Sequence, residues 1–473
     1  MSPRSPSGPQ SPLHPAQSLR PTDRAHLRSR LSELNILIAA LTAERDALQA
    51  ESDAIVYPVL SLPPEITTEI FQRCVRHPAV HSPLEAPLLF TQICHQWREI
   101  ALGSPELWQS LSFIRRAPVE VLQTWLPRSG DLPLDCTFHC KDVAAAGPML
   151  KASLQHSRRW RDIDLGIPLA SFPELRLDEV EFPILRKISF GVTKSTSEDF
   201  NSLAIALRKV PSLREAHICI LPHVTFNLPW HQLWTLTLHV MPIGDCLSLL
   251  AGCPQLRHLS VATMGVAVPH SPDLTVTLSN LESLTVDASM AMVENTALLE
   301  HLTLPQLRKL VITLWNMVPH HVTPLAALTQ RSAFPLHAFE LTVGSISRET
   351  FHFCLAALPD STAHLTVTWG AGLHSQFTSL AEPGMLPHLA CLILRGGRLT
   401  DEQCTSLVDA LDARRGMSMD LSLTGFTRLE DAQGIFKGGL LARMRALASE
   451  GMKIRVVISG SAHSKEVLVD SLT

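Results

Sequence analysis

Residues 254–261 read PQLRHLSV and residues 305–312 read PQLRKLVI, and this eight-residue pattern decides the fold. In both stretches a proline comes first, and apolar residues occupy the third, sixth and eighth positions. Alternation of apolar residues with a period of two is typical of a strand that has one buried face. We therefore expect each copy to be a short β-strand that follows a turn made by the proline.

The pattern recurs between residues 183 and 394. Further copies are PILRKISF at 183–190, PSLREAHI at 211–218, HQLWTLTL at 231–238, NLESLTV at 280–286, PLHAFELTV at 335–343, AHLTVTW at 363–369 and PHLACLIL at 387–394. When the copies are aligned, their central apolar residues are Ile188, Ala216, Leu236, Leu259, Leu284, Leu310, Phe339, Leu365 and Leu392. These residues are about 20 to 29 positions apart, which is the period of leucine-rich repeats. We expect earlier strands near Leu134 and Ile163.

Segments with helical spacing of apolar residues separate some of the strand copies. They are SEDFNSLAIALRKV at 197–210, GDCLSLLAGC at 244–253 and DEQCTSLVDALDARRG at 401–416. Alternating strands and helices predict an α/β repeat fold, a degenerate leucine-rich-repeat solenoid over residues 114–473. A helix and strand within 434–460 would cap its C-terminal end. Because a regular Asn or Cys position is missing, a mixed α/β domain with irregular strands is the alternative.

The N-terminal part of the chain has two segments of different character. Residues 1–27 are rich in Pro and Ser and lack a hydrophobic period, so we expect a disordered arm. Residues 28–53 are predicted to form an amphipathic helix or short coiled coil, because apolar residues follow three- and four-residue steps. The residues are Leu31, Leu34, Ile38, Leu41 and Leu48. The pattern does not choose between docking on the chain's own body and dimerisation.

Residues 57–113 predict a small all-α module of three helices. The first begins at the Pro63–Pro64 pair, which suits the first turn of a helix. The second runs from about Leu88 to Leu102, and the third follows Ser104. Three short helices bury little surface by themselves, so we expect a partner or a neighbouring domain to cover part of the module.

This module resembles the F-box motif, in the form common among fungal F-box proteins. The resemblance rests on LSLPPEITTEIFQRCV at 60–75 and LFTQICHQWREIALGSPELWQSL at 89–111, which combine Leu-Pro-x-Glu-Ile, Cys-x-x-Trp and Ser-Pro-x-Leu-Trp in order. The linker between the first two helices is longer and richer in proline than in a minimal F-box. The resemblance implies binding to a Skp-family linker subunit, which joins a cullin and its RING partner. The residues implied in that contact are Leu62, Pro63, Glu65, Ile66, Ile70, Ile93, Cys94, Trp97 and Ile100.

The resemblance and the repeats together predict a substrate-recognition adaptor of an SCF-type (Skp-cullin-F-box) ubiquitin ligase. The F-box would bind the linker, and the repeats would bind an unknown protein substrate. Candidate substrate-binding residues project beside the predicted strands and are Arg186, Arg214, Glu215, Arg257, His258, Glu282, Arg308 and Lys309. The alternative is a cullin-independent repeat scaffold that binds other proteins.

Composition and motifs argue against other classes. A net charge of −4 gives no attraction for phosphate backbones, so nucleic acid is not an expected partner. No apolar stretch is long enough for a membrane span, and we expect an intracellular protein, cytoplasmic or nuclear. The sequence has no phosphate-binding glycine loop and no HExxH or GxSxG motif. We therefore expect no enzyme, cofactor or metal, and we interpret DCTFHC at 135–140 as an alternating strand.

Overall fold

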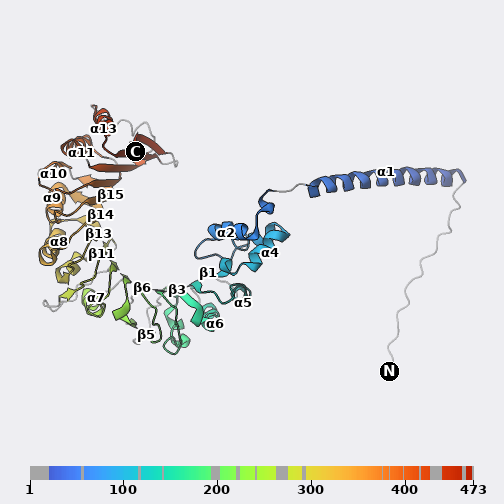
Figure 1. Cartoon of the computed structure of the whole chain (residues 1–473), viewed down its shortest axis with the longest axis horizontal. Coiled ribbons are helices and arrows are strands. Elements are labelled where there is room, and N and C mark those ends of the chain that lie inside the picture. The colour runs from blue at the N-terminus through green and yellow to red at the C-terminus, as the bar shows by residue number, and fades with distance from the viewer. Residues whose placement is uncertain are drawn as a thin grey trace, which may run out of the picture. The chain divides into compact units, whose positions relative to one another are not determined.

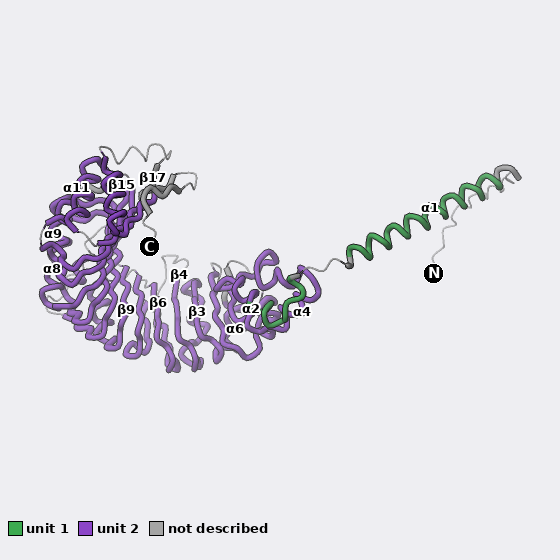
Figure 2. Tube along the Cα trace, turned by 45° about the horizontal axis from the view of Figure 1, so that its top comes forward, with its two compact units in different colours: residues 1–69 green, residues 70–473 purple. Residues whose placement is uncertain are grey.

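The computed structural model divides into two compact units, residues 1–69 and residues 70–473 (Figure 2). The described residues are 21–54, 58–114, 119–140, 143–192, 203–219, 224–239, 242–262, 275–289, 295–374, 377–382, 384–397, 399–414, 417–426, 439–460 and 465–470. Residues 1–20 of the expected disordered arm lie outside them.

Unit 1 holds helix α1 (Pro21–Ala54), the 3-10 turn η1 (Pro58–Ser61) and the start of helix α2 (Pro64–Cys74). Helix α1 begins inside the segment that we expected to be disordered, because a proline is well suited to the first helical turn. The five apolar residues that predicted this helix are all exposed. No helix among the described residues is both long and apolar enough to cross a membrane.

Unit 2 begins with the rest of α2, followed by the short helices α3 (Phe90–Ile93) and α4 (His95–Gly103) and the 3-10 turn η2 (Pro105–Trp108). The prediction of one helix from Leu88 to Leu102 is wrong. Cys94 interrupts it with an extended backbone, φ −154° and ψ 170°, and its Sγ accepts a hydrogen bond from the Trp97 N–H at 3.5 Å. Cys94 therefore caps a new helix.

A 15-stranded sheet makes up most of unit 2 (Figure 1). Its strands, in spatial order, are β1 (Ser110–Ile114), β2 (Leu134–His139), β3 (Trp160–Ile167), β4 (Lys187–Val192), β6 (Glu215–Cys219), β8 (Thr235–His239), β9 (His258–Ala262), β11 (Ser283–Ala288), β13 (Lys309–Met317), β14 (Ala338–Ser347), β15 (His364–His374), β16 (Cys391–Gly396), β17 (Ser418–Phe426), β18 (Ile454–Gly460) and β19 (Lys465–Asp470). All neighbouring pairs are parallel except β18 and β19. The fold is therefore mixed α/β with a large parallel sheet, as the alternating pattern predicted.

The register of the sheet follows the alignment of the sequence copies. The nine central apolar residues, from Ile188 on β4 to Leu392 on β16, are direct partners on successive strands. All nine side chains are at most 2% exposed. One face of the sheet is thus continuously apolar and buried. The residues that alternate with these apolar residues along each strand form the other face.

Helices cover the apolar face, and in Figure 1 they lie on the outer side of the strands of this unit. They are α5 (Val119–Arg128), α6 (Val143–Leu154), α7 (Ile243–Leu250), α8 (Pro319–Ser332), α9 (Arg348–Ala356), α10 (Thr378–Ala381), α11 (Asp401–Ala413) and α13 (Leu440–Ser449). The 3-10 turns η3 (Ser157–Arg159), η4 (Leu169–Ser171), η5 (Pro173–Leu175), η6 (Trp230–Gln232) and η7 (Asn295–His301) occupy other returns. Helices α7 and α11 lie where helical spacing predicted them.

One predicted helix, residues 197–210, is wrong over its described part. Residues Leu203–Ala206 form strand β5, which pairs in parallel with β7 (Val224–Asn227). A second small sheet joins β10 (Val276–Thr277) and β12 (Leu302–Thr303). The connection between β4 and β6 is thus extended where we expected a helix. Its residue Ile205 is 4% exposed and packs into the core from strand β5.

The two ends of the sheet differ from the prediction in detail. All residues of strand β1 except Ile114 lie within residues 57–113, which we expected to be wholly helical. It belongs to the sheet because Leu111 and Phe113 alternate with serines and are buried. At the C-terminal end, the predicted helix and strand are α13 and β18, and the antiparallel strand β19 follows them.

Candidate binding surfaces

Three aromatic rings form the interior of the helical module, by which we mean residues 70–108. Phe71 on α2 stacks on Phe90 with ring centroids 3.9 Å apart, and the Trp97 ring meets Phe71 edge-on at 5.0 Å. Phe71 and Phe90 are 1% and 6% exposed. The two segments of the motif are thus packed together by apolar contacts.

The module is part of the same apolar body as the sheet. The Ala79 N–H donates to Ser110 Oγ at 3.1 Å, and the Ser112 N–H donates to the Ala79 carbonyl at 2.6 Å. Trp108 is fully buried, and its indole Nε1 donates to the Ala101 carbonyl at 2.8 Å. The segment around Ala79 therefore covers the outer edge of β1, which would otherwise be an unpaired strand edge.

The residues that the F-box resemblance implicates fall into two groups. Trp97 and Ile100 are partly buried and pack against the core, and Cys94 caps α4. Ile66, Ile70 and Ile93 are exposed by 50%, 42% and 52%, and Pro63 and Glu65 are also exposed. Leu62 is half-buried. The first group stabilises the module, and the second is available to a partner.

Exposed apolar side chains are concentrated in this part of the chain. Outside α1, the large exposed apolar residues of the described part are Val59, Ile66, Ile70, Leu84, Leu89, Ile93, Leu102, Ile184, Trp234, Trp315 and Phe353. Seven of these eleven lie between Val59 and Leu102, whereas the much longer described part after residue 103 has the other four. Large apolar residues that are exposed and close together in the sequence are candidates for contact with another protein.

A second surface lies along the residues that immediately precede the strands. We call Arg186, Arg214, Trp234, Arg257, Glu282, Arg308 and His337 the edge row. From Arg214 on, the backbone N–H of each member donates to the backbone carbonyl of the preceding member of the row, at 2.8–2.9 Å. The row is continuous across seven neighbouring strands.

The structure brings the predicted substrate-binding residues together. Arg186, Arg214, Arg257, Glu282 and Arg308 are members of the edge row. Glu215, His258 and Lys309 directly follow the row members Arg214, Arg257 and Arg308 in the sequence. They share one position in the register of β6, β9 and β13. Lys309 Nζ forms an ion pair with Glu340 at 2.7 Å, which offsets its charge.

Sequence reasoning missed Trp234, which occupies the same edge-row position as the arginines. Its side chain is 44% exposed, whereas Trp108, Trp125 and Trp160 are buried. The guanidinium carbons of Arg214 and Arg257 lie 5.6 Å and 5.2 Å from the centroid of its ring. The aligned copies carried the signal, because HQLWTLTL has tryptophan where other copies have arginine.

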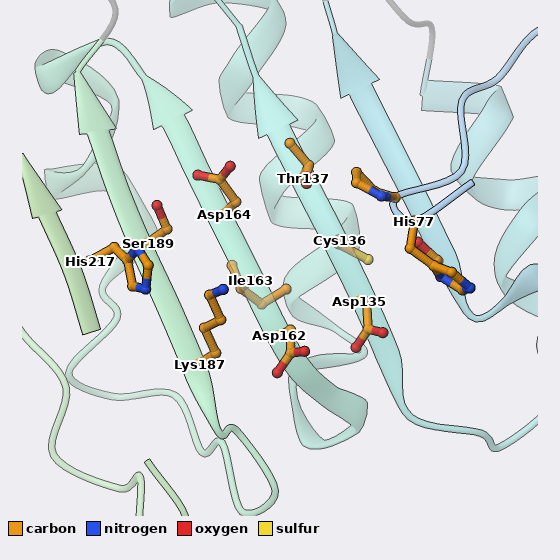
Figure 3. Close-up of a pocket in the computed structure, with 12 residues that line it drawn as sticks. His77, Asp135, Cys136, Thr137, Asp162, Ile163, Asp164, Lys187, Ser189 and His217 are labelled. Atoms are coloured by element: carbon orange, nitrogen blue, oxygen red, sulfur yellow. The ribbon is translucent and has the colours of Figure 1, made fainter. Parts of the chain in front are cut away.

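A cavity of about 460 Å³ opens on the polar face of strands β1, β2, β3, β4 and β6 (Figure 3). Its lining includes His77 from the segment after α2 and the carboxylates of Asp135, Asp162 and Asp164. These residues were not predicted as a site, because they come from separate copies and meet only through the strand register. Their alternate positions on neighbouring strands were the available signal.

Charges in this cavity are partly compensated. Arg161 donates its Nε–H to Asp135 at 2.9 Å, and His139 Nε2 lies 3.0 Å from Asp164 Oδ2. Burial, followed by the nearby carboxylate of Asp135, raises the pKa of Asp162. Burial and the neighbouring Lys187 lower the pKa of His217.

The thiol that lines this cavity is not a ready nucleophile. Burial raises the pKa of Cys136 to about 12, so the thiol is protonated at neutral pH. Cys136 and Cys140 are both buried on or beside β2, whose alternating burial is that of the predicted DCTFHC strand. The chemistry of the cavity therefore suits polar binding contacts rather than thiolate attack.

No family model matches the sequence of this chain, and no curated protein matches it.

Proposed function

We propose that this chain is the substrate-recognition adaptor of an SCF-type ubiquitin ligase. In this proposal the F-box-like segment binds a Skp-family linker, and through it a cullin and a RING subunit. The following sheet is a leucine-rich-repeat-like solenoid that binds a protein substrate. In this proposal the chain supplies no catalytic group. It acts by holding the substrate near the enzyme that transfers ubiquitin, which raises the effective concentration of the substrate.

One observation carries the proposal. The exposed apolar side chains of Ile66, Ile70 and Ile93 lie in the segment whose sequence resembles the F-box. An isolated exposed isoleucine is ordinary, but seven large apolar residues between Val59 and Leu102 favour a protein partner. The partner that the resemblance implies is the Skp-family linker.

The architecture of unit 2 supports the division of labour. Hydrogen bonds from Ala79 and Ser112 join the helical module to the first strand of the sheet. Within unit 2, the part of the helical module that carries Ile70 and Ile93 would therefore belong to the same body as the sheet that holds the substrate. Such a connection limits loose motion between the two binding functions.

Purified full-length chain and purified Skp-family linker provide the test. We expect the parent chain to form a complex on size-exclusion chromatography and an Ile66→Asp, Ile70→Asp, Ile93→Asp variant to form none, since buried charge at an interface is costly. The matched control is Ile184→Asp, an exposed isoleucine (38%) outside the module. Failure of the parent to bind would refute the adaptor proposal and leave the cullin-independent scaffold.

A further inference from the structure

The edge row concentrates positive charge on an acidic protein. From Arg186 to Arg308 it contains four arginines and one glutamate, a net charge of +3 (4 − 1), whereas the whole chain carries −4. None of these four arginines forms an ion pair with a carboxylate within the described part of the chain. The charge of the row is therefore directed to solvent and can attract an anionic ligand.

Trp234 lies at the centre of this charge. Strands β6 and β9 flank β8, and they bring Arg214 and Arg257 to within 5.6 Å and 5.2 Å of its ring centroid. A guanidinium over an aromatic ring is stabilised by about 0.5–1 kcal/mol at exposed sites. The ring thus holds two like charges beside each other, where neither is neutralised.

The site is partly organised before any ligand binds. Arg214 Nη1 donates to the carbonyls of Leu213 at 2.8 Å and Pro211 at 3.2 Å, which fixes its guanidinium beside the ring. The backbone of the row is fixed by the hydrogen bonds between successive members. Preorganised side chains lose less conformational entropy on binding, which favours affinity.

The dimensions of the row fit an extended peptide. Neighbouring strands are about 4.8 Å apart, so the five steps from Arg186 to Arg308 span roughly 24 Å, the length of about seven extended residues. Carboxylates match the planar, two-pronged donor geometry of arginine. The half-exposed indole offers an apolar surface to a side chain between the acidic residues.

A nucleic-acid strand fits the same surface less well. Glu215 and Glu282 stand beside the arginines, and they would repel a continuous phosphate backbone. One exposed tryptophan in the row does not provide the successive stacking platforms that single strands use. An acidic peptide, whose charges are spaced by intervening residues, can avoid the two glutamates.

We propose that Trp234, between Arg214 and Arg257, anchors a binding site for an extended acidic peptide segment. The inference rests on the proposed function only for the source of this peptide, which would be the ubiquitination substrate. It names the class of substrate by chemistry: acidic residues that contact the arginines, with an apolar residue on the indole.

The test selects ligands without bias. A display library of random peptides of about twelve residues is panned on the purified full-length chain, and the enriched peptides are measured by fluorescence anisotropy. We expect enrichment of acidic peptides that contain an apolar residue. We also expect their affinity to fall about tenfold or more in Trp234→Ala and in Arg214→Gln, Arg257→Gln.

Two variants separate the anchor from general effects. Arg214→Lys, Arg257→Lys keeps the charge and loses the planar stacking, so we expect an intermediate loss of affinity. Trp315→Ala removes an indole that is 70% exposed on another part of the sheet, and it should bind as the parent does. Unchanged melting temperatures establish that all variants are folded.

The outcomes distinguish this inference from the adaptor proposal. Enrichment of neutral or basic peptides, or binding unchanged by Trp234→Ala, would overturn the inference. Tighter binding of labelled oligothymidine, also lost in Trp234→Ala, would replace the peptide by a nucleic acid. Linker binding is measured on the same preparations, and we expect Trp234→Ala to retain it, so each proposal can fail alone.

Discussion

The indole Nε1 of Trp125 donates a hydrogen bond to the main-chain carbonyl of Trp108 at 3.0 Å, and the two rings meet edge-on with centroids 4.7 Å apart. Both side chains are at most 1% exposed. Trp108 ends the helical module and Trp125 lies on α5, so this pair joins the module to the first return of the sheet.

Trp125→Phe should lower the free energy of unfolding by about 1–3 kcal/mol, because it leaves the buried Trp108 carbonyl without its donor. Urea unfolding followed by circular dichroism measures the change. Trp315→Phe, at an exposed position, is the control and should change stability by less than about 0.5 kcal/mol. Equal effects of the two substitutions would contradict the role of the Trp125 hydrogen bond.

Because side chains alternate between the two faces of the sheet, the adjacent residues Leu310 and Val311 should contribute very differently to stability. Leu310 is fully buried between its partners Leu284 and Phe339, and Leu310→Ala should cost about 2–5 kcal/mol. Val311 faces the polar side of the sheet, so Val311→Ala should cost less than about 1 kcal/mol. Thermal unfolding of both variants decides the matter. A larger loss at Val311 would mean that the strand is shifted by one residue.

We expect alanine substitutions at Gly344 and Gly103 to change the stability of the protein in opposite directions. A Cβ at Gly344 would lie 2.5 Å from the Trp315 carbonyl oxygen, so Gly344→Ala should destabilise the sheet by about 1–3 kcal/mol. Nothing lies within 4 Å of a Cβ at Gly103, at the end of α4, and Gly103→Ala should stabilise by about 0.5–1 kcal/mol. Melting temperatures that move in the same direction would contradict this packing.

Asp162 should make the protein less stable as pH rises. Its folded-state pKa lies above the ordinary value, because burial and Asp135 disfavour the charged carboxylate. The folded state therefore holds the proton more tightly, and stability falls between the ordinary pKa and the raised one. Asp162→Asn should raise the melting temperature at pH 7 and flatten this dependence. The exposed Asp178→Asn is the control, and a lower melting temperature for Asp162→Asn would reverse the sign.

The strands could be predicted from the sequence because their apolar residues meet one another directly. Ile188, Leu284 and Leu392 belong to distant copies, yet the same spacing places all three on one buried row. Such a strand is specified by the alternation of its own apolar residues. It is also specified by its neighbours, whose apolar residues are buried at the same register positions. Local pattern and global packing therefore agree.

Returns between strands were harder to predict, because a short apolar segment can be buried as a helix or as a strand. Residues around Ile205 have helical spacing but form β5, since a parallel partner is available in β7. At Cys94 the helical pattern continues, but an extended backbone divides the helix. In both places tertiary packing overrides the local preference.

The candidate surfaces depend on contacts that no single segment reveals. Arg214, Trp234 and Arg257 are separated along the chain and meet only when β6, β8 and β9 are adjacent. The same holds for Asp135 and Asp162 in the cavity of Figure 3. The repeat pattern predicted the row members Arg186, Arg214, Arg257, Glu282 and Arg308 but not Trp234, whose exposure depends on the side-chain packing.

Hydrogen–deuterium exchange of the full-length chain, with and without purified Skp-family linker, tests the adaptor claim most directly. We predict protection on linker addition in residues 62–74 and 89–94, where Ile66, Ile70 and Ile93 are exposed, and unchanged exchange in β9. Absence of protection in both segments at saturating linker, or protection confined to the sheet, would contradict the claim.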